Sequence, residues 1–316
     1  MDRNLLGNTS LEVSKLCFGS LTMGPLQTNK TPEEGARLLL HGFERGINFV
    51  DTAELYETYP HIKKALKSYN REDIVIASKS YAYSEETAEA SLSKALKEMD
   101  IDYIDIFKLH EQESEYTIRG HYEALEYLFK MKEKGYIRAV GISTHTIAAV
   151  NASLNIKEIE VLHPIVNKAG LGIQDGTIEE MLEAIKKAHN MGKGIYGMKP
   201  LGGGNLLKNF DECFDFVLGI PYLNSIAVGM QTIEEIDANI AIFEGREIED
   251  ELLTKIKNKK RNLKIDFWCE RCGQCVSTCR HGALKIENDK LIVDKDKCVL
   301  CSYCSKSCPH FCIKVI

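Results

Sequence analysis

The sequence predicts an α/β fold in which a (β/α)8 barrel is followed by a small α+β domain, and two patterns carry this prediction. Across residues 13–243, short apolar runs alternate with longer amphipathic stretches, which is the pattern of a parallel sheet with right-handed crossovers. Nine of the 11 cysteines then fall within residues 269–312. We therefore expect the barrel in residues 1–262 and the cysteine-rich domain in residues 263–316.

Eight apolar runs are the expected strands, and the amphipathic stretches between them are the expected helices. The strands are expected at residues 15–19, 48–52, 74–78, 103–109, 139–143, 161–164, 194–198 and 225–228. The helices are expected at residues 32–45, 61–69, 86–98, 120–134, 177–190 and 233–242. Eight strands in about 230 residues match the size of a (β/α)8 barrel. A doubly wound open sheet is the alternative.

Composition and charge narrow the class of protein. With 44% apolar and 27% charged residues, the chain has the composition of an ordinary globular protein. Its net charge of -6 argues against a general nucleic-acid binder, because binding to phosphates needs a basic surface. No apolar run is long enough to span a bilayer, and residues 1–4 lack the apolar segment of a secretory signal. We expect a cytoplasmic protein without membrane or nucleic-acid partners, and the sequence does not set its oligomeric state.

A basic stretch lies between the two expected domains. Its cations are Lys255, Lys257, Lys259, Lys260, Arg261 and Lys264. We expect a surface helix there and then a linker. Runs of like charge usually form a solvated surface, and a docking patch for an acidic partner is the alternative.

The cysteines repeat one spacing twice. The two sets are Cys269-x2-Cys272-x2-Cys275-x3-Cys279 and Cys298-x2-Cys301-x2-Cys304-x3-Cys308-Pro309. Thiolates are soft, anionic ligands suited to iron, and in this spacing the fourth cysteine of each run binds the other cluster. One [4Fe–4S] cluster is therefore expected on Cys269, Cys272, Cys275 and Cys308, and a second on Cys298, Cys301, Cys304 and Cys279. Zinc, the alternative, does not explain the repeated third and fourth cysteines.

This cysteine-rich segment resembles a bacterial two-cluster ferredoxin. Between the two cysteine runs, residues 284–287 and 291–293 flank a polar turn and predict a β-hairpin. Arg280 stands where the family usually has proline after the fourth cysteine, which affects backbone shape rather than ligation. Cys312 lies outside the ligand spacing and is expected to be a small buried residue.

Polar side chains follow three successive strands of the expected barrel. Asp51 ends the second strand, and Tyr56 lies five residues further on. Lys79 ends the third strand and His110 the fourth. Because the carboxyl ends of the strands form one rim, where the catalytic residues of such barrels gather, we expect the four side chains to lie together.

Through these four residues and the cysteine runs, nearly the whole chain, from about residue 6 to residue 316, resembles the aldo-keto reductases, in the branch that carries a C-terminal ferredoxin module. The resemblance implies that Asp51, Tyr56, Lys79 and His110 form the catalytic tetrad. Tyr56 would donate a proton to a carbonyl oxygen that receives a hydride, and would act as the base in reverse. Lys79, held by Asp51, would lower the pKa of this phenol from its usual value of about 10, and His110 would orient the carbonyl.

Two positions near the tetrad need comment. Tyr59 competes for the role of Tyr56, which we favour because its spacing from Asp51 matches that of the family. Glu57 stands where the family usually has glycine, a change that affects the local turn or the charge of the active site.

The same resemblance implies NADPH or NADH, bound in an extended form across the barrel rim. The residues expected to contact it are Gly19, Ser20, Ser143, Met198, Leu201, Gly202, Gly229, Gln231, Glu235 and Asn239. Met198 replaces a tyrosine that often stacks on the nicotinamide, and residues 229–239 match the adenosine segment at a helix N-terminus, a natural phosphate site. The basic residue that often binds a 2′-phosphate is not evident, so the choice between NADPH and NADH stays open.

Three functions fit these features. The first is an oxidoreductase that reduces the carbonyl of a small molecule with NAD(P)H, with two clusters that serve electron transfer or structure. The second is an electron-transfer enzyme whose barrel holds a flavin or a radical-forming substrate, because a hydride carries two electrons whereas each cluster passes one. The third is a redox carrier on a vestigial barrel, against which the complete tetrad argues. A redox protein is a candidate partner beside the carbonyl substrate.

Overall fold

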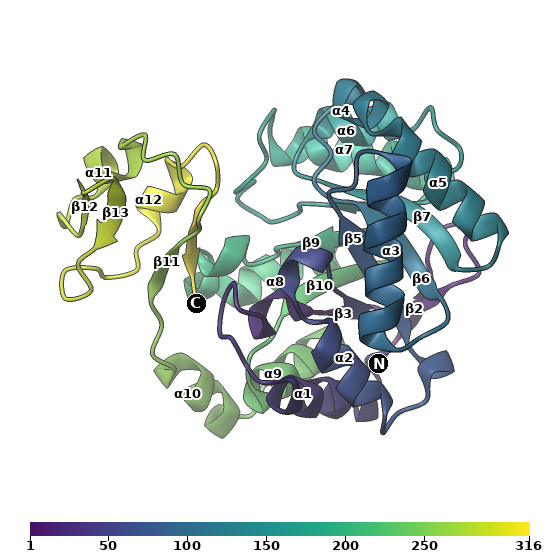
Figure 1. The fold of residues 1–316 in the computed structure, drawn as a ribbon. Helices are drawn as coiled ribbons and strands as arrows, with labels where there is room; N and C mark the ends of the chain where they lie inside the picture. Colours follow the sequence, from purple (N-terminus) through teal and green to yellow (C-terminus); the bar gives the residue numbers. More distant parts are fainter.

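The computed structural model describes residues 1–316 and contains a closed barrel of eight parallel strands (Figure 1). These strands are β3 (Leu16–Gly19), β4 (Phe49–Asp51), β5 (Val75–Ser80), β6 (Ile104–Leu109), β7 (Ile137–Thr144), β8 (Val161–Pro164), β9 (Gly194–Met198) and β10 (Ser225–Gly229). The last of them, β10, pairs with the first, β3, and thereby closes the sheet. The predicted (β/α)8 barrel is confirmed, and the open doubly wound alternative is wrong.

Ten α-helices belong to the barrel and to the segment that follows it. They are α1 (Pro32–Glu44), α2 (Tyr59–Leu66), α3 (Glu85–Met99), α4 (Glu115–Gly120), α5 (Tyr122–Glu133), α6 (Ile147–Ser153), α7 (Ile178–Asn190), α8 (Phe210–Leu218), α9 (Ile233–Phe243) and α10 (Asp250–Asn258). The start of α1 shows why these boundaries form: the Thr31 hydroxyl accepts from the Glu34 backbone N–H, and the Glu34 carboxylate accepts in return from that of Thr31. None of the helices is both long and apolar enough to cross a membrane.

The core has two parts, one outside the barrel sheet and one inside it. The larger part packs the outer helices against the strands. The inner part joins residues that begin strands, such as Phe49 and Val75, to Leu6 and Leu11 near a short hairpin. This hairpin, β1 (Arg3–Leu5) with β2 (Glu12–Ser14), therefore covers the amino end of the barrel and leaves the carboxyl rim open for a site.

The cysteine-rich segment forms a small separate body beside the barrel (Figure 1). It contains β11 (Leu263–Ile265), α11 (Gln274–Thr278), β12 (Leu284–Glu287), β13 (Lys290–Val293), α12 (Tyr303–Lys306) and β14 (Ile313–Val315). The expected hairpin is present as β12–β13. Its turn residues Asn288 and Asp289 have φ of 48° and 58°, the left-handed values that a tight two-residue hairpin turn requires.

The two ends of the cysteine-rich segment pair with each other and contact the barrel. Strand β11 pairs antiparallel with β14, the last strand of the chain. The side-chain amide of Asn205, in the loop after β9, donates to the carbonyl of Ile313 at 2.9 Å. A side chain at Gly204 would collide with the carbonyl oxygen of Val315, because its Cβ would lie 2.0 Å away. The loop after a barrel strand is thus shaped to accept the C-terminal strand.

Candidate active site and cluster sites

Asp51 and Lys79 form a buried ion pair at the carboxyl rim. Asp51 is the last residue of β4, and Lys79 lies near the end of the neighbouring strand β5. The Nζ of Lys79 lies 2.5 Å from Oδ1 of Asp51 and donates also to the carbonyl of Thr52 at 2.9 Å. Both side chains are almost wholly buried, so the ammonium group is held in one place by fixed acceptors.

Tyr56, rather than Tyr59, lies next to this pair. Tyr56 ends a short 3-10 helix (Glu54–Tyr56) after β4, and the Nζ of Lys79 lies 4.6 Å from the centre of its ring. Tyr56 also lines the large cavity of the molecule. Tyr59 lies in α2 with its hydroxyl 2.7 Å from that of Ser78, and it is fully buried in the core. These positions support the preference for Tyr56 over Tyr59, and the catalytic role of Tyr56 stays a prediction.

Burial raises the pKa of the Tyr56 phenol well above its usual range, and the negative charges of Asp51 and Glu111 raise it further. The resemblance predicts that Lys79 lowers this pKa, whereas in the structure burial and the Asp51 carboxylate raise it. Tyr56 therefore stays protonated at neutral pH. A protonated phenol suits a proton donor to a carbonyl oxygen better than a resting base.

His110 completes the group of four. Its ring is 5.8 Å from that of Tyr56 in an edge-on arrangement, and the Tyr81 ring stacks on its other side at 4.4 Å. Burial and the positive charge of Lys79 lower the pKa of His110 well below its usual value, so the imidazole is neutral. Its Nδ1 is buried without a hydrogen-bond partner. The four residues lie together, as expected from their positions at the strand ends.

Lys108 is a second buried lysine that contacts the Asp51 carboxylate. It is not among the site residues predicted from the sequence. Its Nζ lies 2.7 Å from Oδ2 of Asp51, and it stands level with Lys79 on the neighbouring strand. The Tyr196 hydroxyl donates to the same oxygen at 2.7 Å, and His163 stacks on the Tyr196 ring at 3.9 Å. One signal was available: a lysine inside an apolar strand is rarely buried unless it is paired.

A cavity of about 520 Å³ opens beside the tetrad, within the size range of sites for small molecules and cofactors. Among the expected site residues, Asp51, Tyr56, Gly19, Met198, Leu201, Gly229, Gln231, Glu235 and Asn239 line it. Ser20, Ser143 and Gly202 do not. The Ser20 hydroxyl instead bonds to that of Thr58 at 2.8 Å, and the Ser143 hydroxyl accepts from the backbone N–H of Glu111 at 2.9 Å. Lys79 and His110 are not among the lining residues, and both contact Tyr56, which is.

The cysteine-rich body supplies part of the same cavity wall. Leu300, Lys314 and Val315 line it together with Lys199 at the end of β9. Burial and the charge of Lys199 lower the pKa of Lys314 to about 7. The ammonium of Lys314 lies 3.3 Å from the centre of the Phe311 ring. Occupants of the cavity would therefore touch both parts of the chain.

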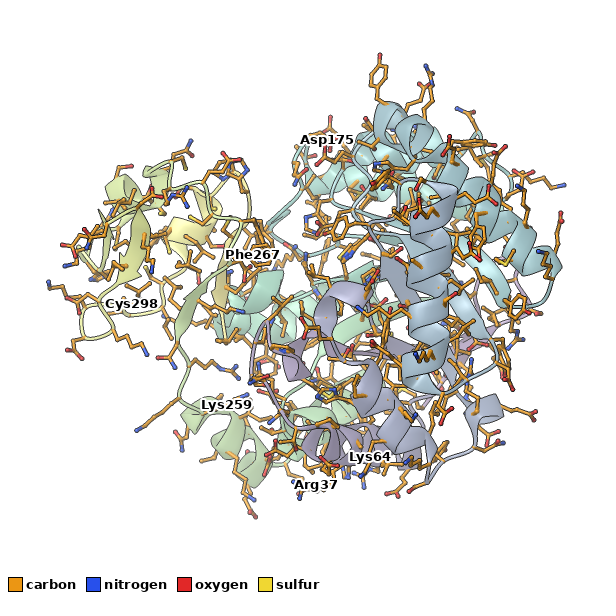
Figure 2. All side chains as sticks on the ribbon, in the orientation of Figure 1. Arg37, Lys64, Asp175, Lys259, Phe267 and Cys298 are labelled. Atoms are coloured by element: carbon orange, nitrogen blue, oxygen red, sulfur yellow. The ribbon has the colours of Figure 1, made fainter.

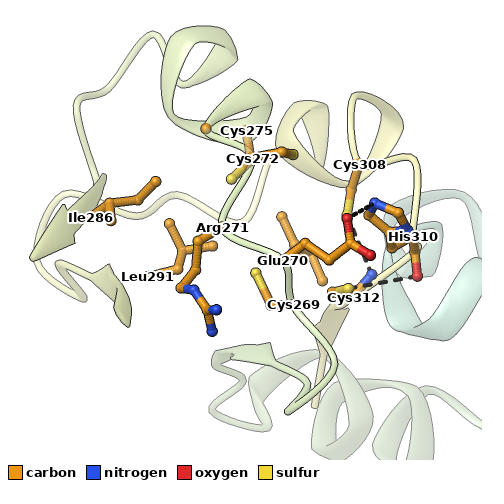
Figure 3. A pocket seen from close by; sticks show the side chains of 12 residues that line it. Cys269, Glu270, Arg271, Cys272, Cys275, Ile286, Leu291, Cys308, His310 and Cys312 are labelled. Carbon is orange, nitrogen blue, oxygen red and sulfur yellow. Dashed lines mark hydrogen bonds and ion pairs between the residues drawn. The ribbon is translucent and has the colours of Figure 1, made fainter. Parts of the chain in front are cut away.

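The eight expected cluster ligands line two small hollows of the cysteine-rich body. Cys269, Cys272, Cys275 and Cys308 line the first, which Figure 3 shows from close by. Cys279, Cys298, Cys301 and Cys304 line the second. Each hollow takes three sulfurs from one run and the fourth from the other, which is the crossed arrangement of a two-cluster protein. Cys312 is buried at the edge of the first hollow, and its expected place outside the ligand set stays a prediction.

The backbone around the two hollows repeats. In the first loop Arg271 and Gly273, which flank the second cysteine, have φ of 56° and 81°; in the second loop Leu300 and Ser302 have φ of 51° and 64°. Residues in this left-handed conformation direct neighbouring backbone N–H groups into a concave surface that can bind an anion. Non-glycine residues adopt the conformation only where the surrounding structure imposes it. The residues present therefore fit two anionic, thiolate-capped clusters.

The fourth cysteine of each run also accepts a backbone hydrogen bond. The N–H of Ala283 lies 3.3 Å from the sulfur of Cys279, and the N–H of Cys312 lies 3.3 Å from that of Cys308. Both donors stand four residues after their acceptor. Hydrogen bonds to ligand sulfurs stabilise the charge of a cluster, so this repeat is a second feature that fits the two groups.

Comparisons with known proteins identify both parts of the chain. The model of the "Aldo/keto reductase family" matches residues 15–217, and that of the "4Fe-4S binding domain" matches residues 291–314. L-galactose dehydrogenase of Arabidopsis thaliana is 23% identical over 307 residues, which cover 83% of this chain and 95% of that protein. A methylglyoxal reductase of Escherichia coli K12 is 26% identical over 176 residues, which cover 53% of this chain and 63% of that protein, less than two thirds.

Solved structures share the barrel. The holo form of an aldo-keto reductase from Bacillus halodurans superposes with a TM-score of 0.65 at 21% identity, and the match covers 81% of this chain and 95% of that one. At this identity the likeness shows the fold alone. The family model, in contrast, matches well over half of the chain. The chain therefore belongs to the aldo/keto reductase family of oxidoreductases and carries a 4Fe-4S binding domain at its C-terminal end.

Proposed function

We propose that the chain reduces the carbonyl group of a small molecule with NADPH or NADH, that Tyr56 donates the proton, and that the C-terminal segment holds two [4Fe–4S] clusters. One observation carries the catalytic part of this proposal. Tyr56 lines the cavity while the ammonium of Lys79, fixed by Asp51, lies 4.6 Å from the centre of its ring. The relative from Escherichia coli is named for the reduction of methylglyoxal, a small carbonyl compound, which supports the proposed class of substrate.

The residues around the cavity fit a nicotinamide dinucleotide. The cavity is lined both by Asp51 and Tyr56 of the tetrad and by Gln231, just before α9, and Asn239 of α9, so one extended molecule can contact both sets of residues. A reduced nicotinamide, when bound, supplies the hydride. Met198 and Leu201 give the wall an apolar part, which helps to exclude water from the reaction.

Each member of the tetrad then has a role in the movement of the proton. Tyr56 donates its phenolic proton to the carbonyl oxygen as negative charge develops there. Lys79 stabilises the tyrosinate left behind, because its ammonium group lies close to that ring. His110 is neutral and keeps a hydrogen-bonding capacity that the protein does not use, which makes it available to orient the carbonyl.

A pair of matched variants tests this proposal. Tyr56→Phe removes the proton donor, and we expect carbonyl reduction to fall by at least about 10²–10⁴-fold, the usual contribution of general acid catalysis. Tyr59 lies three residues after Tyr56 in the sequence. Tyr59→Phe removes only the hydrogen bond to Ser78, and this variant should keep most of the activity. Equal activity in the two variants, with cluster absorbance unchanged in both, would contradict the proposed role of Tyr56.

A second function is favoured by the shared cavity wall. Leu300 lies between the expected ligands Cys298 and Cys301, and it lines the same cavity as Tyr56. A flavin in the cavity would then lie beside a cluster and could exchange single electrons with it. Anaerobic purification followed by identification of extracted cofactors separates the two proposals. A stoichiometric flavin would support this second function, and its absence would leave reduction by a nicotinamide alone.

A further inference from the structure

One end of the cavity wall is formed by the segment that links the barrel to the cluster domain, residues 257–261. On the barrel side it is lined by Gln231 and Glu235, at the start of α9. On the other side it is lined by Lys257, Lys259 and Arg261, which lie at the end of α10 and between α10 and β11. Figure 2 labels Lys259 on this connecting segment, between the barrel and the smaller body.

The cations of the linker hold Glu235 in place. The Nζ of Lys259 lies 2.8 Å from Oε1 of Glu235 and donates also to the side-chain oxygen of Gln231. The guanidinium of Arg261 lies 3.3 Å from the same Oε1. The other oxygen of Glu235 accepts the backbone N–H of Gln231 at 2.8 Å. Both oxygens of the carboxylate are therefore already in use.

This arrangement leaves positive charge and hydrogen-bond donors to spare. Lys259 and Arg261 together have eight N–H groups, of which three take part in the hydrogen bonds just described. Their side chains keep 23% and 17% of their exposure, so neither is sealed in the core. With Lys257, three cations face a single carboxylate at this end of the cavity, which leaves a net charge of +2.

An anion, and more narrowly a phosphate, matches this end of the cavity. In Rossmann folds an unphosphorylated ribose is recognised by an acidic side chain that accepts from its 2′-hydroxyl, but here Glu235 already accepts three hydrogen bonds from the protein. A phosphate brings two negative charges and several acceptor oxygens, which suit a guanidinium fork and an ammonium group. Glu235 then serves to position the two cations.

We propose that Lys259 and Arg261 of the linker bind the 2′-phosphate of NADPH, so that the connection to the cluster domain selects the phosphorylated coenzyme. This inference rests on the proposed function, since it takes a nicotinamide dinucleotide as the ligand of the cavity. It accounts for the lack of a basic residue within residues 229–239, because the cations come from a later part of the chain. Coenzyme affinity consequently depends on how the linker is held against the barrel.

Calorimetric titration of the full-length, cluster-loaded protein tests the proposed phosphate site without a turnover assay. The probes are adenosine 2′,5′-bisphosphate, which carries the 2′-phosphate, and 5′-AMP, which lacks it. The variants are Lys259→Met, Arg261→Met and the control Lys260→Met, an exposed linker lysine that does not line the cavity. Lys259→Arg keeps the charge, and cluster absorbance checks that every variant is folded.

We expect each Met variant at positions 259 and 261 to weaken binding of the bisphosphate about tenfold or more, the value of one charge-assisted hydrogen bond. Binding of 5′-AMP should stay unchanged in both, and the control Lys260→Met and the conservative Lys259→Arg should bind the bisphosphate nearly as the parent does. Unchanged bisphosphate binding in both Met variants, or an equal loss for both probes, overturns the inference. If the parent protein binds neither NADPH nor NADH, the proposed function fails; if it binds both equally well, only the selection by the linker fails.

Discussion

The ammonium group of Lys108 lies 2.7 Å from Oδ2 of Asp51, so one buried carboxylate is shared between two lysines. Lys79 holds the other oxygen of the same carboxylate. When both lysines are protonated, this group carries a net positive charge next to Tyr56. Burial and the repulsion of Lys79 lower the pKa of Lys108 to about 7, although Asp51 acts in the opposite direction. The charge beside the proposed proton donor therefore changes near neutral pH.

This arrangement predicts a pH dependence that Lys108→Met should remove. Below its pKa of about 7, Lys108 is charged, and its positive charge makes Tyr56 a stronger acid. As the pH rises through this value the charge is lost, so kcat for carbonyl reduction should fall. We expect an inflection near neutral pH in the parent protein and a flat profile in Lys108→Met. If the pH profile of Lys108→Met keeps the inflection, Lys108 is not the group that causes it.

The two cluster sites predict different outcomes for neighbouring cysteines. Cys272→Ala removes a proposed ligand, and we expect the purified protein to hold about half of the iron and to show about half of the cluster absorbance. Cys312→Ala changes a buried cysteine of the same domain that we place outside the ligand set, and its iron content should match that of the parent. Anaerobic iron analysis of both variants measures this. Equal loss of iron in the two would contradict the assignment of the ligands.

The contact between the barrel and the C-terminal strand predicts a specific loss of stability. Gly204→Ala would place a methyl group 2.0 Å from the carbonyl oxygen of Val315, at a φ of +84°. Gly245→Ala has a similarly left-handed φ of +66° but no atom within 4 Å. Backbone strain costs about 1–3 kcal/mol in either variant, and only Gly204→Ala adds the collision.

Thermal unfolding and limited proteolysis compare these two variants. We expect a lower Tm for Gly204→Ala than for Gly245→Ala, together with faster cleavage within the segment that joins the barrel to the cluster domain. If the two unfold alike, the close approach to Val315 does not hold the domains together.

The barrel was predictable because its pattern is local. Each strand is a short apolar run, and each long helix has one apolar face, so the alternation was visible along the chain. The hairpin β1–β2 was missed because its strands have three residues each, too few to show a period. The helices α6 and α8 were also missed.

The candidate site was predictable where spacing along the chain carries the information. Asp51, Tyr56, Lys79 and His110 each lie at or shortly after the end of a strand, and the cysteines repeat a spacing. The remaining contacts arise only when distant segments meet. The contact of Lys259 with Glu235 spans 24 residues, which include most of α9 and all of α10. The burial of Tyr56, which raises its pKa, depends on the packing around it.

The most direct test of the proposed function follows the hydrogen that reaches the carbonyl carbon. An aromatic aldehyde is reduced in ordinary water with NADPH deuterated at C4 of the nicotinamide on the transferred side, and the alcohol is analysed by mass spectrometry and NMR. Direct hydride transfer, with Tyr56 supplying only the proton on oxygen, predicts one deuterium on the former carbonyl carbon of every product molecule. A product whose new carbon-bound hydrogen comes from water would contradict it and would point to single electrons delivered through the clusters.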